Sequence, residues 1–129
     1  LVVGDRFVFQ SEVLFPKAGA DLNPAGTEEM TKLATAIKQL EVEIPPDINW
    51  VLRVDGHTDA DPIQSAQFKS NWELSTARAS AVVKFLIAQG VQPRHLVAAG
   101  FGEFQPLDPG TSEDAKAQNR RIELKLTER

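Results

Sequence analysis

The polar segment 55–61, read as DGHTDAD, places three potential ligand side chains at alternate positions: His57, Asp59 and Asp61. Carboxylates and imidazole at this spacing resemble a metal-binding cluster. However, a zinc site usually needs three or four protein ligands, and the other histidine of the chain, His95, lies in an apolar segment. The segment also lacks the periodic oxygen ligands of a calcium loop. We therefore expect no metal, and we interpret His57 as a strand-end histidine bonded to nearby backbone.

Arg78 is a second unusual residue, because it lies on an apolar helical stripe, four residues after Leu74 and four before Val82. A half-buried guanidinium needs an anionic partner or hydrogen-bond acceptors. One interpretation is an arginine that reaches the edge of the core and pairs with a local carboxylate. The other is a planar fork that holds the carboxylate of a ligand. The residues alone leave both open.

The acidic segment leads from the end of a predicted strand to the start of the helix that carries Arg78. Ligands of α/β proteins bind at such strand ends, and helix N-termini offer free N–H groups to anions. Asp59 and Arg78 would then face each other across one cleft. This arrangement suits a zwitterion, with an ammonium at Asp59 and a carboxylate at Arg78.

Hydrophobic periodicity predicts the elements that position these residues. Residues 5–15 read as strand, in one piece or in two around Ser11 and Glu12. A helix capped by Thr27 and stopped by Pro45 follows. Residues 48–56 then alternate as a strand.

The second half of the chain shows similar signals. Ser70 and Glu73, at capping-box spacing, begin a helix that Gly90 ends. Residues 95–102 are predicted as a strand, residues 103–119 as a loop with one helical turn, and residues 120–128 as the last strand. The expected fold is α/β (α+β): a two-layer βαβαβ-β mixed sheet with helices on one face and an antiparallel last strand.

Composition limits the possible functions. The 129 residues suit a single domain spanning 1–129, with 42% hydrophobic and 25% charged residues. A net charge of -4 argues against nucleic acid as a partner. The absence of cysteine excludes disulfides and thiolate sites. No nucleophile–base spacing or glycine-rich phosphate loop is present, so we expect no enzyme and no cofactor.

The sequence shows no signal peptide and no apolar run near the roughly 20 residues of a membrane span. It begins with Leu1 rather than Met. We expect a fragment of a longer protein, with membrane contact only through a missing N-terminal segment.

Four ordered motifs carry a resemblance to a known family: VDGHTDADP, NWELSTARASAVVKFLIAQGV, LVAAGFGEFQP and NRRIELKL. They resemble the OmpA-like C-terminal domain, a family that includes the peptidoglycan-associated lipoprotein and the flagellar stator protein MotB. The longer loop before NWELS is most similar to the MotB branch. The resemblance covers nearly the whole chain.

The resemblance implies non-covalent binding of peptidoglycan in the periplasm through diaminopimelate of the stem peptide. In that family, the aspartate of GHTD and the arginine of LSxARA hold diaminopimelate, which here are Asp59 and Arg78. The other implied ligand-binding residues lie at motif positions: Thr58, Asn71, Leu74, Phe15, Arg120 and Arg121.

Some positions depart from the pattern or have a plainer interpretation. Where many members carry Phe-Asp in the first loop, this chain has Phe15-Pro16, so an aspartate contact is lost. Arg121 alternates with apolar residues as on a solvated sheet face. Trp72 is expected to pack at the helix start rather than to stack on sugars.

The sequence therefore predicts a peptidoglycan-binding module that anchors a larger membrane protein, a MotB-like stator or similar, to the wall. We expect a periplasmic domain of a Gram-negative envelope protein, anchored in the inner membrane, with a homodimer as a possible state. The alternative is a structural or dimerisation domain of an envelope complex that has lost wall binding.

Overall fold

The computed structural model describes residues 2–3 and 6–129. The elements in chain order are β1 (Val2–Val3), β2 (Arg6–Gln10), α1 (Ser11–Leu14), α2 (Pro24–Glu43), β3 (Trp50–His57), α3 (Asn71–Ala88), the 3-10 turn η1 (Pro93–His95), β4 (Leu96–Gly100), α4 (Glu113–Asn119) and β5 (Arg121–Glu128). None of the helices in these ranges is long and apolar enough to cross a membrane.

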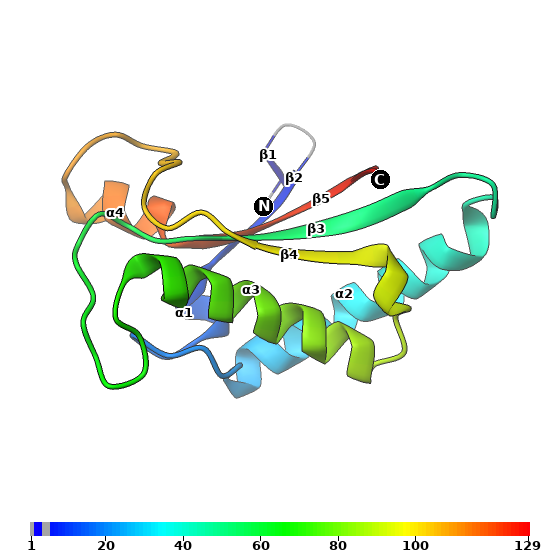
Figure 1. Cartoon of the computed structure of the whole chain (residues 1–129), viewed down its shortest axis with the longest axis horizontal. Coiled ribbons are helices and arrows are strands. Elements are labelled where there is room, and N and C mark those ends of the chain that lie inside the picture. The colour runs from blue at the N-terminus through cyan, green and yellow to red at the C-terminus, as the bar shows by residue number, and fades with distance from the viewer. Residues whose placement is uncertain (1, 4–5) are drawn as a thin grey trace.

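The described strands form one sheet in the order β1-β2-β5-β3-β4. β5 runs antiparallel to both β2 and β3, whereas β3 and β4 are parallel. The helices α2 and α3 lie on one face of the sheet (Figure 1). The predicted two-layer fold with a mixed sheet and an antiparallel last strand is confirmed.

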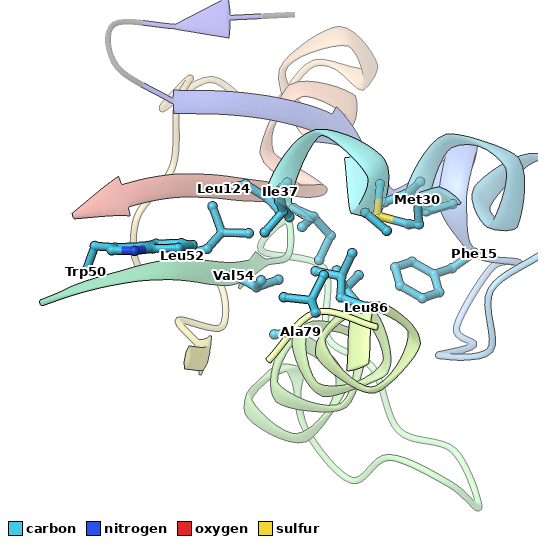
Figure 2. Packing of buried hydrophobic residues seen from close by; sticks show 14 residues of the cluster. Phe15, Met30, Ile37, Trp50, Leu52, Val54, Ala79, Leu86 and Leu124 are labelled. Atoms are coloured by element: carbon cyan, nitrogen blue, oxygen red, sulfur yellow. The ribbon is translucent and has the colours of Figure 1, made fainter. Parts of the chain in front are cut away.

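The core lies between this face of the sheet and the helices α2 and α3 (Figure 2). Alternate residues of β3 and β5 point into it, and Val54 and Leu124 are paired across the strands and fully buried. Full burial of an aliphatic side chain contributes about 1.5–3 kcal/mol. The alternation that predicted β3 from the sequence is therefore the pattern that fixes its register against β5.

Gly56 allows α3 to approach β3 closely. A Cβ atom at this position would lie 2.2 Å from the carbonyl oxygen of Ser75, so a larger residue would push the helix away from the strand. The contact places the N-terminal half of α3 beside the end of β3. Thr58 and Asp59, which follow that strand, therefore lie next to the helix that carries Arg78.

The first predicted strand is wrong beyond Gln10. Residues Ser11–Leu14 form the helical turn α1, in which the Phe15 N–H donates to the Ser11 carbonyl at 2.8 Å. The turn buries the adjacent Leu14 and Phe15 together, whereas an extended strand would point them to opposite faces. Tertiary burial therefore overrides the β-propensity of this segment.

The cap of the next helix also differs from the prediction. α2 begins at Pro24, and the side chain of Asn23, not that of Thr27, accepts from the Gly26 N–H at 2.7 Å. Proline at the first helical position lacks the N–H that would be unpaired there, so a helix that starts four residues earlier is favourable. The predicted start at Ser70 and end at Gly90 of α3 agree with its bounds, and Ser70 caps that helix.

Two smaller differences lie in the second half of the chain. α4 has seven residues rather than a single turn, and Ser112 caps it. His95 belongs to η1 rather than to β4, stacks on Trp50, and contacts the Glu41 carboxylate at 2.6 Å.

Candidate ligand-binding site

A cleft of about 430 Å³ lies where β3 ends and α3 begins. It is bounded by α1 and the loop after it, the loop 58–63, the N-terminal part of α3, and Arg120. All residues predicted from the sequence to contact ligand line this cleft, except Arg121: Phe15, Thr58, Asp59, Asn71, Leu74, Arg78 and Arg120.

Arg78 is almost completely buried, with 5% of its surface exposed. Its Nε donates to the Gly19 carbonyl at 2.8 Å and its Nη2 to the Pro16 carbonyl at 3.2 Å. The guanidinium carbon lies 5.2 Å from the centre of the Phe15 ring, a cation–π contact. Arg78 thereby holds the first loop in place.

The guanidinium of Arg78 forms no ion pair with any carboxylate in the described part of the chain, and its Nη1 makes no hydrogen bond there. Burial lowers the pKa of Arg78 to about 10, although the nearby carboxylates of Glu12 and Asp59 oppose this shift. Arg78 stays charged at neutral pH. Among the described residues the local ion pair, the plainer of the two interpretations, is therefore absent, which leaves the buried charge available to an external anion.

Asp59 faces the same cleft and is tied by two hydrogen bonds. Its Oδ1 accepts from the Asp61 N–H at 3.1 Å, and its Oδ2 accepts from Nη1 of Arg120 at 2.7 Å. Arg120 also contacts Glu12 of α1 through Nε. Burial alone would lower the pKa of Arg120, but the hydrogen bonds to Asp59 and Glu12 raise it. Arg120 thus bridges two carboxylates across the cleft.

The start of α3 supports the wall of the cleft. Residues 71, 74 and 78 share one face of the helix because of its 3.6-residue period. The Asn71 side-chain amide donates to the carbonyls of Asp59 and Asp61 at 3.3 and 3.0 Å. The loop after β3 is therefore held against the helix by main-chain acceptors.

Several residues of the cleft were not predicted from the sequence. Glu12 was assigned to a strand, which hid its approach to Arg120. Asp61 lines the cleft and pairs with Lys116 of α4 at 3.3 Å. The remaining acidic residue is Glu113, at the start of α4. Its helix is capped by Ser112, whose Oγ accepts from the Ala115 N–H at 3.1 Å.

Arg121 lies outside the cleft, on the sheet face opposite α2 and α3, and the expectation of a solvated face is wrong here. Its Nε donates to Glu123 at 2.5 Å, and its other nitrogens donate to the Asn119 and Gln105 carbonyls at 3.0 and 2.7 Å. Arg121 and Glu123 are 2% and 1% exposed. The Gln105 carbonyl of the loop after β4 and the Asn119 carbonyl at the end of α4 are the acceptors that make this burial possible.

His57 also faces away from the cleft, because side chains alternate along β3. Within residues 2–3 and 6–129, neither ring nitrogen has a hydrogen-bond partner, so the expected bond to nearby backbone is absent there. Instead, the ring stacks on Phe101 at 4.9 Å between centroids. Burial, together with the charge of Arg121, lowers the pKa of His57 to about 4.

This orientation separates His57 from Asp59 and Asp61, so the spacing that suggested a metal does not form a site. On the opposite face, ligand atoms of Asp55, His57 and Glu123 do lie within 4.8 Å of one another. Arginines already engage both carboxylates, however: Arg53 contacts Asp55 at 3.3 Å, and two others contact Glu123. Their positive charges oppose the binding of a cation.

Comparisons with known proteins identify relatives over most of the chain. The OmpA family matches residues 7–120. Motility protein B of Helicobacter pylori strain J99 is 32% identical over 121 residues, which is 94% of this chain and 45% of that protein. The peptidoglycan-associated lipoprotein of Pseudomonas aeruginosa is 39% identical over 72 residues, 56% of this chain and 40% of that protein.

Solved structures give the same result. A putative MotB-like protein from Desulfovibrio vulgaris has a TM-score of 0.85 at 30% identity, covering 96% of this chain and 75% of that one. The cell wall anchor of the type VI secretion system from P. aeruginosa has a TM-score of 0.80 at 27% identity, covering 95% and 80%.

The chain spans about half the length of the curated relatives it matches. The predicted resemblance to OmpA-like domains, with MotB proteins among the near relatives, is confirmed. The chain belongs to the OmpA family, whose members are non-enzymatic, as the sequence predicted.

Proposed function

We propose that this domain binds cell-wall peptidoglycan non-covalently through diaminopimelate of the stem peptide. The observation that carries the proposal is Arg78, a buried cation without a carboxylate partner in the described residues, in one cleft with Asp59. Relatives named as a peptidoglycan-associated lipoprotein and a cell wall anchor support peptidoglycan as the ligand.

The chemistry of the cleft fits a zwitterionic amino acid side chain. In the proposal, Arg78 receives a carboxylate through its free Nη1, and Asp59 receives an ammonium. Arg120 already satisfies one oxygen of Asp59 and stays close enough to balance its charge. The uncharged residues Thr58, Asn71 and Leu74, together with Phe15, form the walls against which the ligand stem packs.

The first loop contributes main-chain atoms rather than an acid. Pro16 stands where many family members carry aspartate, and its carbonyl accepts from Arg78. Since proline has no N–H and no charged side chain, we assign this position to the support of Arg78.

For the whole protein, we propose that this single module anchors a larger envelope protein to the wall, on the periplasmic side of a Gram-negative inner membrane. A MotB-like stator is one such parent, because MotB proteins are among the relatives. A homodimer is compatible with this role. A domain that had lost wall binding would not need the open cleft of about 430 Å³.

The proposal is tested by isothermal titration of the isolated domain with a stem tripeptide that contains diaminopimelate. Saturable binding is expected, and the matching lysine tripeptide, which lacks one carboxylate, should bind about ten times more weakly. Asp59→Asn should weaken binding, whereas Asp47→Asn, at an exposed acid outside the cleft, serves as the control. Equal affinity for both tripeptides would contradict recognition of diaminopimelate.

A further inference from the structure

Trp72 and Phe104 form an exposed aromatic pair outside the cleft. The expectation that Trp72 packs into the protein is only half met, since 50% of its surface is exposed, and Phe104 is 59% exposed. Their rings are stacked, with centroids 5.1 Å apart and an angle of 26° between planes. Exposed apolar patches of this kind mark sites of binding.

The pair is held by an ordered loop rather than by chance contact. Gly102, which adjoins both rings, has a φ of +60°, which favours glycine, and a Cβ there would touch both rings at 3.4–3.5 Å. The Gly102 N–H donates to Ser75 Oγ at 3.0 Å, which fixes the loop to α3. The rings therefore form a preorganised surface, which we call the aromatic platform (Trp72 and Phe104).

The aromatic platform lies beside the cleft, although neither Trp72 nor Phe104 lines it. Trp72 follows the cleft residue Asn71 directly, so their Cα atoms are about 3.8 Å apart. The Asn71 amide also reaches the Glu103 carboxylate at 3.5 Å. The Gly102 carbonyl accepts from the N–H of Thr58, another cleft residue, at 2.9 Å. A ligand that extends from the cleft past Thr58 and Asn71 therefore comes next to the loop that carries Phe104.

We propose that the aromatic platform binds the glycan strand of peptidoglycan, the N-acetylated sugars to which the stem peptide is attached. This inference rests on the proposed function of the cleft. A pyranose ring has an apolar C–H face that suits an aromatic ring and a polar rim of hydroxyl and acetamide groups. Glu73 and Glu103 adjoin the aromatic residues in sequence. Their carboxylates accept from Ser70 and Asn71 through one oxygen each, which leaves the second oxygen of each as an acceptor for that rim.

The charge at the aromatic platform also favours this occupant. The two acidic residues that adjoin Trp72 and Phe104 in the chain disfavour an anionic partner such as nucleic acid or an acidic lipid surface. The sugars of peptidoglycan are neutral once the stem peptide is attached. The covalent bond between sugar and peptide keeps the glycan close to any stem bound in the cleft, which raises its effective concentration.

The test compares two ligands that differ only in the sugar: the stem tripeptide and the same tripeptide carrying its disaccharide. The wild type should bind the disaccharide-peptide about ten times more tightly by calorimetry. The Trp72→Ala/Phe104→Ala variant should bind both ligands with the affinity that the wild type shows for the bare tripeptide. Phe7→Ala, which removes an aromatic residue 52% exposed on β2, is the control and should keep the difference.

The outcomes separate the two proposals. If the wild type binds both ligands equally, the aromatic platform is not a sugar site, while the cleft proposal stands. If neither ligand binds, the proposed function fails and the sugar site fails with it. If the double variant keeps the disaccharide preference but changes the sedimentation coefficient of the protein, the aromatic platform is a protein interface, and the inference is overturned.

Discussion

Arg78→Lys tests whether the planar fork, rather than the charge, makes the cleft a binding site. Lysine keeps the positive charge and most of the stem, but its ammonium cannot reproduce the fixed geometry of a guanidinium. In the structure, Arg78 donates to the carbonyls of Gly19 and Pro16 and lies over Phe15. The substitution therefore affects both the support of the first loop and the approach of a ligand carboxylate.

The magnitude follows from these contacts. A hydrogen bond from a charged donor contributes about 1.5–3 kcal/mol, so loss of one of the two carbonyl contacts lowers the free energy of unfolding by about that amount. Because domains of this kind are stable by about 5–15 kcal/mol, the variant should remain folded. Loss of one charge-assisted contact to the ligand weakens binding by about ten- to a hundredfold.

Chemical denaturation and calorimetry on the same preparation separate these effects. The expected result is a folded variant with a lowered midpoint and at least tenfold weaker binding of the diaminopimelate tripeptide. Arg94→Lys, at an exposed arginine outside the cleft, should change neither quantity. A folded Arg78→Lys variant with wild-type affinity would refute the role of the fork.

Three further predictions concern the rest of the fold. The pKa of His57 is lowered to about 4 by burial and Arg121, below its unfolded value near 6.5, so the unfolded chain binds a proton that the native state does not. The free energy of unfolding should therefore fall by roughly 3 kcal/mol from pH 6.5 to pH 4. The variant His57→Phe, whose ring can still stack on Phe101, should show a smaller loss when urea titrations are compared at each pH. Asp55, with a raised pKa, acts in the opposite sense and makes the comparison between variants necessary. Gly56→Ala should cost about 3 kcal/mol or more, measured by denaturant melts, because its Cβ meets a helix carbonyl at 2.2 Å. Addition of a chelator should leave the melting temperature unchanged, and a large drop would restore the metal interpretation.

Local signals explain why some elements were predictable. The alternation of β3, the Ser70 cap and the stop at Gly90 depend on neighbours in sequence, and the structure agrees with each. The turn α1 was missed because its conformation depends on docking against α2. The two elements are so close there that a Cβ at Gly26 would lie 2.5 Å from the Leu14 carbonyl oxygen. No local pattern carries that information.

In the site, too, some features followed from neighbours in sequence and others depend on tertiary contacts. Asp59 and Arg78 were predicted to face one cleft because the loop of one leads into the helix of the other, and both line the cleft. The choice between Arg120 and Arg121 was not predictable, although neighbouring residues point to opposite sides. It depends on where α1 places Glu12, which contacts Arg120, and where the loop after β4 places the Gln105 carbonyl, which accepts from Arg121.

The location of the bound stem peptide tests the central claim most directly. In ¹H–¹⁵N spectra of the labelled domain, titration with the diaminopimelate tripeptide should shift the amides around the cleft: residues 17–19, 58–61 and 71–78. Amides at the far end, near Trp50 and His95, should stay unchanged. Saturable shifts confined to the cleft are the predicted result. Shifts centred elsewhere, or none at millimolar tripeptide, would contradict the assignment of the cleft as the wall-binding site.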